Sequence, residues 1–203
     1  MRVIAGQYRS RTLVAPAGDK TRPTSDRLRE TLFNVLGPRV ADAVFLDLYA
    51  GSGAVGIEAL SRGAREVIFV ELAAAAQKAI RANLAALGIR SGYTLETRSV
   101  AATLERFLKD RHSGDRFAQS GPPSASGKTV DLVFLDPPYE RLEEYEAVLS
   151  RLGSASQALL APDALVVAEH ARRHSLAAQY GGLIRTRVLE QGDAALSFYR
   201  AEP

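Results

Sequence analysis

Residues 45–56 read FLDLYAGSGAVG, an apolar β-rich run that passes into a glycine-rich turn and then into a helical pattern. Glycines in such a turn let the backbone approach a ligand closely, and open α/β sheets bind ligands where their strands end. Glu71 follows about 20 residues later, at the end of the next expected strand, where a carboxylate can bind ribose hydroxyls. The stretch therefore predicts a nucleotide-containing ligand at the edge of a parallel sheet.

The rest of the chain repeats this alternation of strand and helix. Short β-rich runs are expected near residues 44–48, 67–71, 93–97, 130–135 and 164–169, with helices near 55–62, 73–87, 101–111 and 142–152. Residues 183–189 and 195–199 are expected to form two more strands joined by a turn. The alternation predicts an α/β fold with a seven-stranded, mostly parallel sheet and helices on both faces.

The N-terminal segment differs from this pattern. Residues 3–14 have β-forming residues on both sides of a polar, glycine-containing centre, which predicts a β-hairpin that leans on the domain, on RNA or on both. Thr24 or Ser25 can then cap a helix that ends at Gly37. We divide the chain into a basic β-hairpin extension, residues 1–20, and a Rossmann-like domain, residues 21–203.

A segment within that domain has a loop composition. Residues 113–129 are rich in serine, glycine and proline, so we expect a flexible loop there. The loop enters the amino end of its strand, whereas ligands bind at carboxyl ends, and we give it no part in the chemistry.

Composition excludes several classes of protein. The 203 residues, 46% of them hydrophobic, suit one domain, and no apolar run or signal-peptide pattern suggests a membrane, so we expect a cytoplasmic protein. The chain has no cysteine, which excludes disulfides, thiolate zinc sites and cysteine nucleophiles. Its three histidines lack the spacing of a hydrolytic metal site, so no metal is expected.

Basic residues gather at the N-terminus. Residues 1–39 hold eight basic side chains against three acidic ones, while the whole chain has a net charge of +3. This distribution suggests a polyanionic partner, although a merely solvated basic face accounts for it equally well. The residues expected to contact nucleic acid are Arg2, Arg9, Arg11 and Arg22.

The glycine turn also resembles a dinucleotide site, so an oxidoreductase must be considered. Asp47 stands directly before the glycines, where it would repel a pyrophosphate but attract the ammonium group of a methionine. The chain also has no room for a separate substrate domain. Both points favour S-adenosylmethionine over a dinucleotide as the ligand.

Residues 136–139 read DPPY at the end of the fourth expected strand. The two prolines hold the chain extended, so the Asp136 carboxylate and the Pro137 carbonyl can point together into a cleft. Both groups are acceptors, and an exocyclic amino group offers two hydrogens. Tyr139 offers a flat face on which a flipped base can stack. The motif predicts methyl transfer to the amino group of a base.

These motifs resemble two groups of known enzymes. The DPPY motif is similar to the signature of amino-methyltransferases acting on adenine, cytosine or guanine. Residues 2–6 (RVIAG), 21–34 (TRPTSDRLRETLFN) and 47–53 (DLYAGSG) together resemble the RsmD family, which makes N2-methylguanine in 16S ribosomal RNA. The resemblance covers nearly the whole chain apart from residues 113–129. It implies a class I methyltransferase fold, S-adenosylmethionine as cofactor, and action on ribosomal RNA of the small subunit or its assembly intermediate. We also expect a monomer.

The resemblance also implies roles for individual residues. Asp47, Gly51 and Gly53 would hold the methionine part of the donor, and Glu71 its ribose. Other residues expected to bind the donor are Tyr49, Ser52, Leu72, Ser99, Val100, Ala101, Arg22 and Thr24. Asp136, Pro137, Pro138 and Tyr139 would be catalytic.

Three of these residues either depart from the family or allow another interpretation. Val100 departs from the family, since many relatives have an aspartate there that binds the adenine amino group; packing and backbone groups of residues 99–101 would replace it. Arg22 and Thr24 fit a phosphate contact and a helix cap almost as well.

Three other functions fit the sequence less well. Methylation at carbon-5 of a pyrimidine needs a cysteine, which the chain lacks. A DNA adenine-N6 or cytosine-N4 methyltransferase would use Asp136 and Tyr139 in the same way, but the chain has no obvious target-recognition domain. A non-catalytic RNA-binding module is the third alternative, and the presence of Asp47, Glu71 and Asp136 argues against it.

Overall fold

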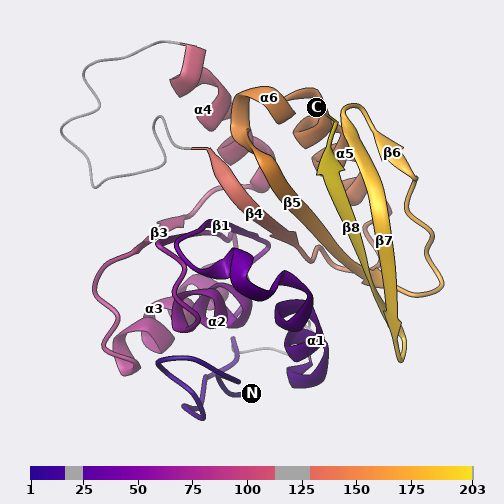
Figure 1. Cartoon of the computed structure of the whole chain (residues 1–203). Helices are drawn as coiled ribbons and strands as arrows, with labels where there is room; N and C mark the ends of the chain where they lie inside the picture. The colour runs from indigo at the N-terminus through magenta and orange to yellow at the C-terminus, as the bar shows by residue number, and fades with distance from the viewer. Residues whose placement is uncertain (17–24, 113–128, 203) are drawn as a thin grey trace.

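The structure is a computed structural model that describes residues 1–16, 25–112 and 129–202. An eight-stranded sheet in the order β3-β2-β1-β4-β5-β8-β7-β6 forms its centre (Figure 1). The strands are β1 (Val44–Leu48), β2 (Glu66–Val70), β3 (Tyr93–Glu96), β4 (Val130–Leu135), β5 (Leu160–Ala171), β6 (Gln179–Tyr180), β7 (Leu183–Gln191) and β8 (Ala194–Ala201). Strands β1 to β5 run parallel, while β8 pairs antiparallel with β5 and β7.

Helices cover both faces of this sheet. They are α1 (Asp26–Leu36), α2 (Ala54–Ser61), α3 (Ala74–Ala86), α4 (Val100–His112), α5 (Leu142–Ser154) and α6 (Ser156–Leu159), with the 3-10 turn η1 (Gly37–Val40) after α1. One apolar core joins α1, α2 and α3 to one face, and a second joins α4, α5 and α6 to the other. Strand residues alternate between these cores, since successive side chains of a strand point to opposite faces. The expected α/β architecture is confirmed.

The strand count differs from the prediction of seven. The additional strand β6 has only two residues, pairs antiparallel with β7 and forms the edge of the sheet. A two-residue strand is too short to produce an alternating pattern, so the sequence alone did not indicate it.

Helix α1 begins as the sequence predicts. The Ser25 hydroxyl accepts a hydrogen bond from the Leu28 amide at 3.1 Å, so Ser25 rather than Thr24 is the N-cap. Gly37 ends the helix with φ of 53°, and its amide donates to the Phe33 carbonyl.

Residues 1–16, here called the N-terminal arm, turn back on themselves as a hairpin does, but without regular strands. One antiparallel bridge joins Arg2 and Thr12, with backbone hydrogen bonds between residues 1–3 and 10–13, and the arm also binds α2. The buried Glu58 carboxylate accepts hydrogen bonds from the Ile4 amide at 2.7 Å and the Ala5 amide at 3.0 Å. The arm therefore satisfies its backbone groups partly within itself and partly against the domain.

Two predictions about boundaries lie partly outside the described residues. The structure does not describe residues 17–24, where the division at residue 20 falls, or residues 113–128 of the expected loop. The two-part division stays a prediction. Within the described ranges, no helix combines the length and the apolar character that crossing a bilayer requires.

Candidate functional site

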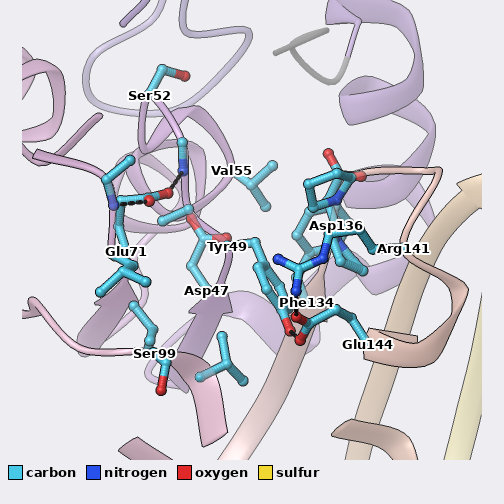
Figure 2. Close-up of a pocket in the computed structure, with 18 of the residues that line it drawn as sticks. Asp47, Tyr49, Ser52, Val55, Glu71, Ser99, Phe134, Asp136, Arg141 and Glu144 are labelled. Atoms are coloured by element: carbon cyan, nitrogen blue, oxygen red, sulfur yellow. Dashed lines mark hydrogen bonds and ion pairs between the residues drawn. The ribbon is translucent and has the colours of Figure 1, made fainter. Parts of the chain in front are cut away.

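A cavity of about 750 Å³ opens at the carboxyl edge of the parallel strands (Figure 2). Its walls come from the segments that follow β1, β2, β3 and β4, because parallel strands end at one edge of the sheet. The predicted residues that line it are Asp47, Tyr49, Gly51, Ser52, Glu71, Leu72, Ser99, Val100, Ala101, Asp136, Pro137, Pro138 and Tyr139. The two predicted motifs thus face one space.

Glu71 joins the glycine turn to the end of β2. Its carboxylate accepts hydrogen bonds from the Gly51 amide at 2.8 Å and the Ala73 amide at 2.7 Å. A carboxylate has about four acceptor positions, so these two bonds leave capacity for hydroxyl groups of a ligand. The contacts also hold the turn over residues 50–53 against the strand.

Asp47 lies at the bottom of the cavity and is 1% exposed. Its Oδ2 accepts a hydrogen bond from the Gly56 amide in the first turn of α2 at 2.9 Å. Burial raises the pKa of Asp47 to about 7, the Gly56 amide opposes that rise, and the nearby Glu71 adds to it. A positively charged ligand group would favour the ionised form of this carboxyl.

The wall of the cavity that follows β2 and β3 combines apolar and polar groups. Leu72 is 65% exposed although it is a large apolar residue, and Val100 is buried beside the cavity. The Ser99 hydroxyl accepts from the Ala102 amide at 3.2 Å and so caps α4. This wall suits a flat ring held by packing, and it supplies no aspartate side chain at residue 100.

Gly53 is not among the lining residues. It has φ of 75° and precedes α2, and a Cβ there would lie 3.2 Å from the Ile80 side chain and 3.3 Å from the Phe69 ring. The position therefore favours glycine because of the turn and the packing beneath it.

Tyr145 of α5 contacts the backbone of the DPPY turn through its hydroxyl. The buried Tyr145 hydroxyl lies 2.9 Å from the Glu169 carbonyl and 3.2 Å from the Pro137 carbonyl. A carbonyl oxygen has two lone pairs, so the Pro137 oxygen keeps one for a substrate. Tyr145, which the sequence did not single out, orients this acceptor.

Tyr139 is also held by a hydrogen bond. Its hydroxyl donates to Oε1 of the buried Glu169, at 2.9 Å, and burial is the main cause that raises the pKa of this tyrosine. The contact fixes one end of the half-buried ring, which still lines the cavity.

A cluster of three polar side chains, Tyr49, Glu144 and Arg141, lies beside the DPPY turn. Tyr49 has φ of 61°, in the left-handed region that few residues other than glycine adopt. Its hydroxyl donates to Glu144 Oε2 at 2.6 Å, and Arg141 Nη2 lies 2.7 Å from Glu144 Oε1. Figure 2 shows Tyr49 between the Glu71 side of the cavity and Asp136. Only Tyr49 of these three was predicted to be in the site; the strained backbone shows only in the structure.

The predicted nucleic-acid contacts lie elsewhere. Arg2, Arg9 and Arg11 belong to the N-terminal arm and are not among the lining residues. Arg2 is 3.9 Å from Asp26, and Arg11 donates to the Ala86 carbonyl at 3.3 Å. Arg22 and Thr24 lie outside the described residues.

The described part of the chain holds no group of three or more histidine or acidic side chains that could bind a metal ion.

Comparisons with known proteins agree with this arrangement. Residues 1–200 match the family described as conserved hypothetical protein 95. The chain is 36% identical over 204 residues to ribosomal RNA small subunit methyltransferase D of Escherichia coli (strain K12), across 100% of this chain and 90% of that protein. It is 34% identical over 200 residues to YlbH of Bacillus subtilis (strain 168), across 98% of each. The solved structure of yhhF from Escherichia coli has a TM-score of 0.77 and 31% identity, covering 100% of this chain and 98% of that one.

Proposed function

Because the chain belongs to the family described as conserved hypothetical protein 95, the RsmD family that its sequence resembles, we propose that it methylates N2 of a guanine in small-subunit ribosomal RNA with S-adenosylmethionine as donor. One observation carries this proposal. The glycine turn with Glu71 and the DPPY turn line the same cavity, so a donor and an amine could meet there. The class I methyltransferase fold expected for such an enzyme is confirmed.

The β1–β2 side of the cavity fits the donor. Glu71 would bind the ribose hydroxyls, the buried Asp47 would attract the methionine ammonium, and Leu72 with Val100 would pack against the adenine ring. S-adenosylmethionine, when bound, supplies a methyl carbon on a positive sulfur, whose carbon–sulfur bond breaks as the nitrogen–carbon bond forms.

The DPPY side would position the amine. The Asp136 carboxylate and the Pro137 carbonyl would accept its two N–H groups, which draws the nitrogen out of conjugation and exposes its lone pair. The proton that the nitrogen must lose after transfer already points at Asp136. Tyr139, held by Glu169, would stack on the base, and Tyr145 keeps the Pro137 carbonyl in place.

The alternatives fit less well. Relatives that match the whole chain carry the name of a ribosomal RNA enzyme, which does not favour a DNA substrate. A non-catalytic RNA-binding module would not need Asp136, Glu71 and Asp47 around one cavity. We further propose that the protein acts as a monomer in the cytoplasm, on the small subunit or an assembly intermediate, and needs no metal.

Methyl transfer by the purified chain tests the proposal. Small-subunit particles and deproteinised RNA from cells lacking the gene would be incubated with labelled donor, and the nucleosides identified by mass spectrometry. We expect N2-methylguanosine at one position, and Asp136→Ala should lower the rate by at least about a hundredfold, as for loss of a transition-state contact. Donor affinity of that variant, measured by calorimetry, should stay within about threefold because Asp136 faces the base.

Asp163→Ala is the control, since Asp163 is an exposed residue outside the cavity. Transfer only to adenine or cytosine of DNA, or full activity in the Asp136 variant, would refute the proposal.

A further inference from the structure

Arg141 and Glu144 form an ion pair in the wall of the cavity, beside the DPPY turn. The Arg141 backbone is fixed on both sides, because its amide donates to the Pro138 carbonyl at 2.8 Å and its carbonyl accepts from the Glu144 amide at 3.0 Å. The pair is therefore tied directly to the motif that would hold the target amine.

Glu144 is held from two directions. The Tyr49 hydroxyl binds Oε2 at 2.6 Å and Arg141 binds Oε1 at 2.7 Å, so each oxygen has one donor and keeps acceptor capacity. Its side chain is 26% exposed and that of Arg141 is 56% exposed, so both can reach a ligand in the cavity. Arg141 contacts Glu143 through Nε at 3.5 Å and Glu144 through Nη2, which involves two of its three nitrogens.

The ion pair offers an acceptor and a donor side by side. Guanine offers the complement, since along its Watson–Crick edge the 2-amino group is followed by the N1–H donor and then by the O6 acceptor. Adenine and cytosine instead have a bare ring nitrogen, an acceptor, next to their amino groups. That nitrogen would face the Glu144 carboxylate without a hydrogen between them, and an unpaired acceptor in a partly dehydrated site is costly.

We propose that Glu144 and Arg141 select guanine as the target base, with Glu144 accepting from N1–H and Arg141 donating to O6, while Tyr49 holds Glu144 in position. The inference rests on the proposed amino-group transfer, and it adds the residues that distinguish one amine from another. Asp136 and Pro137 bind only the amine, which adenine, cytosine and guanine share.

Replacing the target guanosine by 2-aminopurine tests this selection. That base keeps the 2-amino group but has no N1 hydrogen and no O6, so only the contacts to Glu144 and Arg141 are lost. The substrate would be small-subunit RNA ligated from fragments with the analogue at the mapped target, assembled into particles if transfer requires them. For the unaltered protein we expect kcat/KM for 2-aminopurine to be at least about tenfold lower than for guanosine.

Glu144→Ala and Arg141→Ala should each lower kcat/KM for guanosine about tenfold or more, while kcat/KM for 2-aminopurine changes less than about threefold. Glu146→Ala and Arg151→Ala are matched controls, because both residues lie on α5, neither lines the cavity, and their printed partners are Ser150 and Glu105 rather than Arg141 or Glu144. They should keep the preference of the unaltered protein. Donor affinity should be unchanged in all four variants.

Two results would overturn the inference. One is equal use of guanosine and 2-aminopurine by the unaltered protein. The other is an equal loss on both bases in the Glu144 and Arg141 variants, which would indicate a purely structural role. In either case methyl transfer to guanosine would persist and the proposed function would stand, whereas absence of transfer to any RNA would refute the function itself.

Discussion

At the scale of single residues, Asp47 combines a ligand-facing position with an unfavourable environment. Its pKa of about 7 lies above the ordinary value of 3.8, so the folded protein keeps a proton that the unfolded chain releases between about pH 4 and pH 7. The contribution of Asp47 to stability is thus most favourable at low pH and is lost as pH rises through this window. A buried carboxylate of this kind lowers the stability of the folded protein at neutral pH and is typical of a binding site.

Asp47→Asn is expected to remove this pH dependence. Asparagine keeps an acceptor for the Gly56 amide but has no charge to bury. The unaltered protein should lose stability between pH 4 and pH 7.5, whereas the variant should not. The variant should therefore gain roughly 2–4 kcal/mol in free energy of unfolding relative to the unaltered protein over this range. Urea denaturation of both proteins at the two pH values measures the difference, and a constant offset would contradict the assignment.

Donor binding should show the opposite trend. An ionised Asp47 attracts the methionine ammonium, so donor affinity should increase as pH rises from 6 to 7.5, and Asp47→Asn should weaken binding and flatten this rise. Calorimetric titration at several pH values checks the prediction. If donor affinity depends on pH in the same way in the variant, another group must bind the ammonium.

Tyr145→Phe tests the orientation of the Pro137 carbonyl. Loss of the hydroxyl leaves the carbonyls of Pro137 and Glu169 without that donor, which should cost about 1–3 kcal/mol of stability. The turnover number should fall because the amine acceptor is less well placed, while KM for the donor stays nearly constant. Tyr180→Phe is a suitable control, since that buried hydroxyl accepts from the Ala177 amide away from the cavity. An equal fall of the turnover number in both variants would count against a specific role.

At the scale of elements, the N-terminal arm depends on a close approach to α2. Gly6 has φ of 79°, and a Cβ there would lie 1.8 Å from the Ser61 carbonyl oxygen. The Ser61 side chain meanwhile donates to the Ala5 carbonyl at 2.5 Å and accepts from the Tyr8 amide at 3.0 Å. No side chain fits between these backbones, so glycine is required at residue 6.

Gly6→Ala should therefore detach the arm from α2. Gly192→Ala is a matched control, because Gly192 also has positive φ, 62°, but nothing lies within 4 Å of its Cβ position. The control should lose about 1 kcal/mol from backbone strain alone. The Gly6 variant should lose at least about 2 kcal/mol more and be cleaved faster by protease within residues 1–16. Equal losses would show that the contact with Ser61 can relax.

A buried amide connects the arm to the cavity. Asn83 of α3 accepts from the Val14 amide at 2.8 Å and donates to the carbonyls of Val14 and Ser52 at 3.0 and 2.9 Å. Ser52 belongs to the glycine turn of the cavity. Displacement of the arm is therefore expected to loosen the turn that would hold the donor.

At the scale of the whole molecule, the N-terminal arm packs into the same apolar core as segments beside the cavity, but its arginine side chains do not line the cavity, which the arm reaches only with Pro16. A ribosomal substrate would have to contact both at once. Arg9→Ala combined with Arg11→Ala should weaken RNA binding and reduce the slope of log affinity against log salt by about 1.4 to 1.8. Fluorescence titration at several salt concentrations provides the measurement.

Arg151→Ala should leave that slope unchanged, since Arg151 already pairs with Glu105 at 2.9 Å. An unaltered slope in the double variant would indicate that RNA binds another surface of the protein.

The sequence alone determined the architecture and most of the site. Alternating strand and helix patterns located β1 and β4 with their observed bounds, and the two motifs were expected at one edge because parallel strands share their carboxyl ends. Local signals sufficed since periodicity, capping and turn residues act over a few positions.

Tertiary structure alone decided the contacts between distant segments. The Tyr49–Glu144 bond spans 95 positions and the Ile4–Glu58 bond spans 54, and no local pattern indicates either. The arm pairs two of its amides with a buried carboxylate that lies more than 50 positions away, for the same reason. Hydrogen-bond donors and acceptors are satisfied wherever packing brings them together. The wall that would contact the target base therefore forms only when α5 packs against the end of β1.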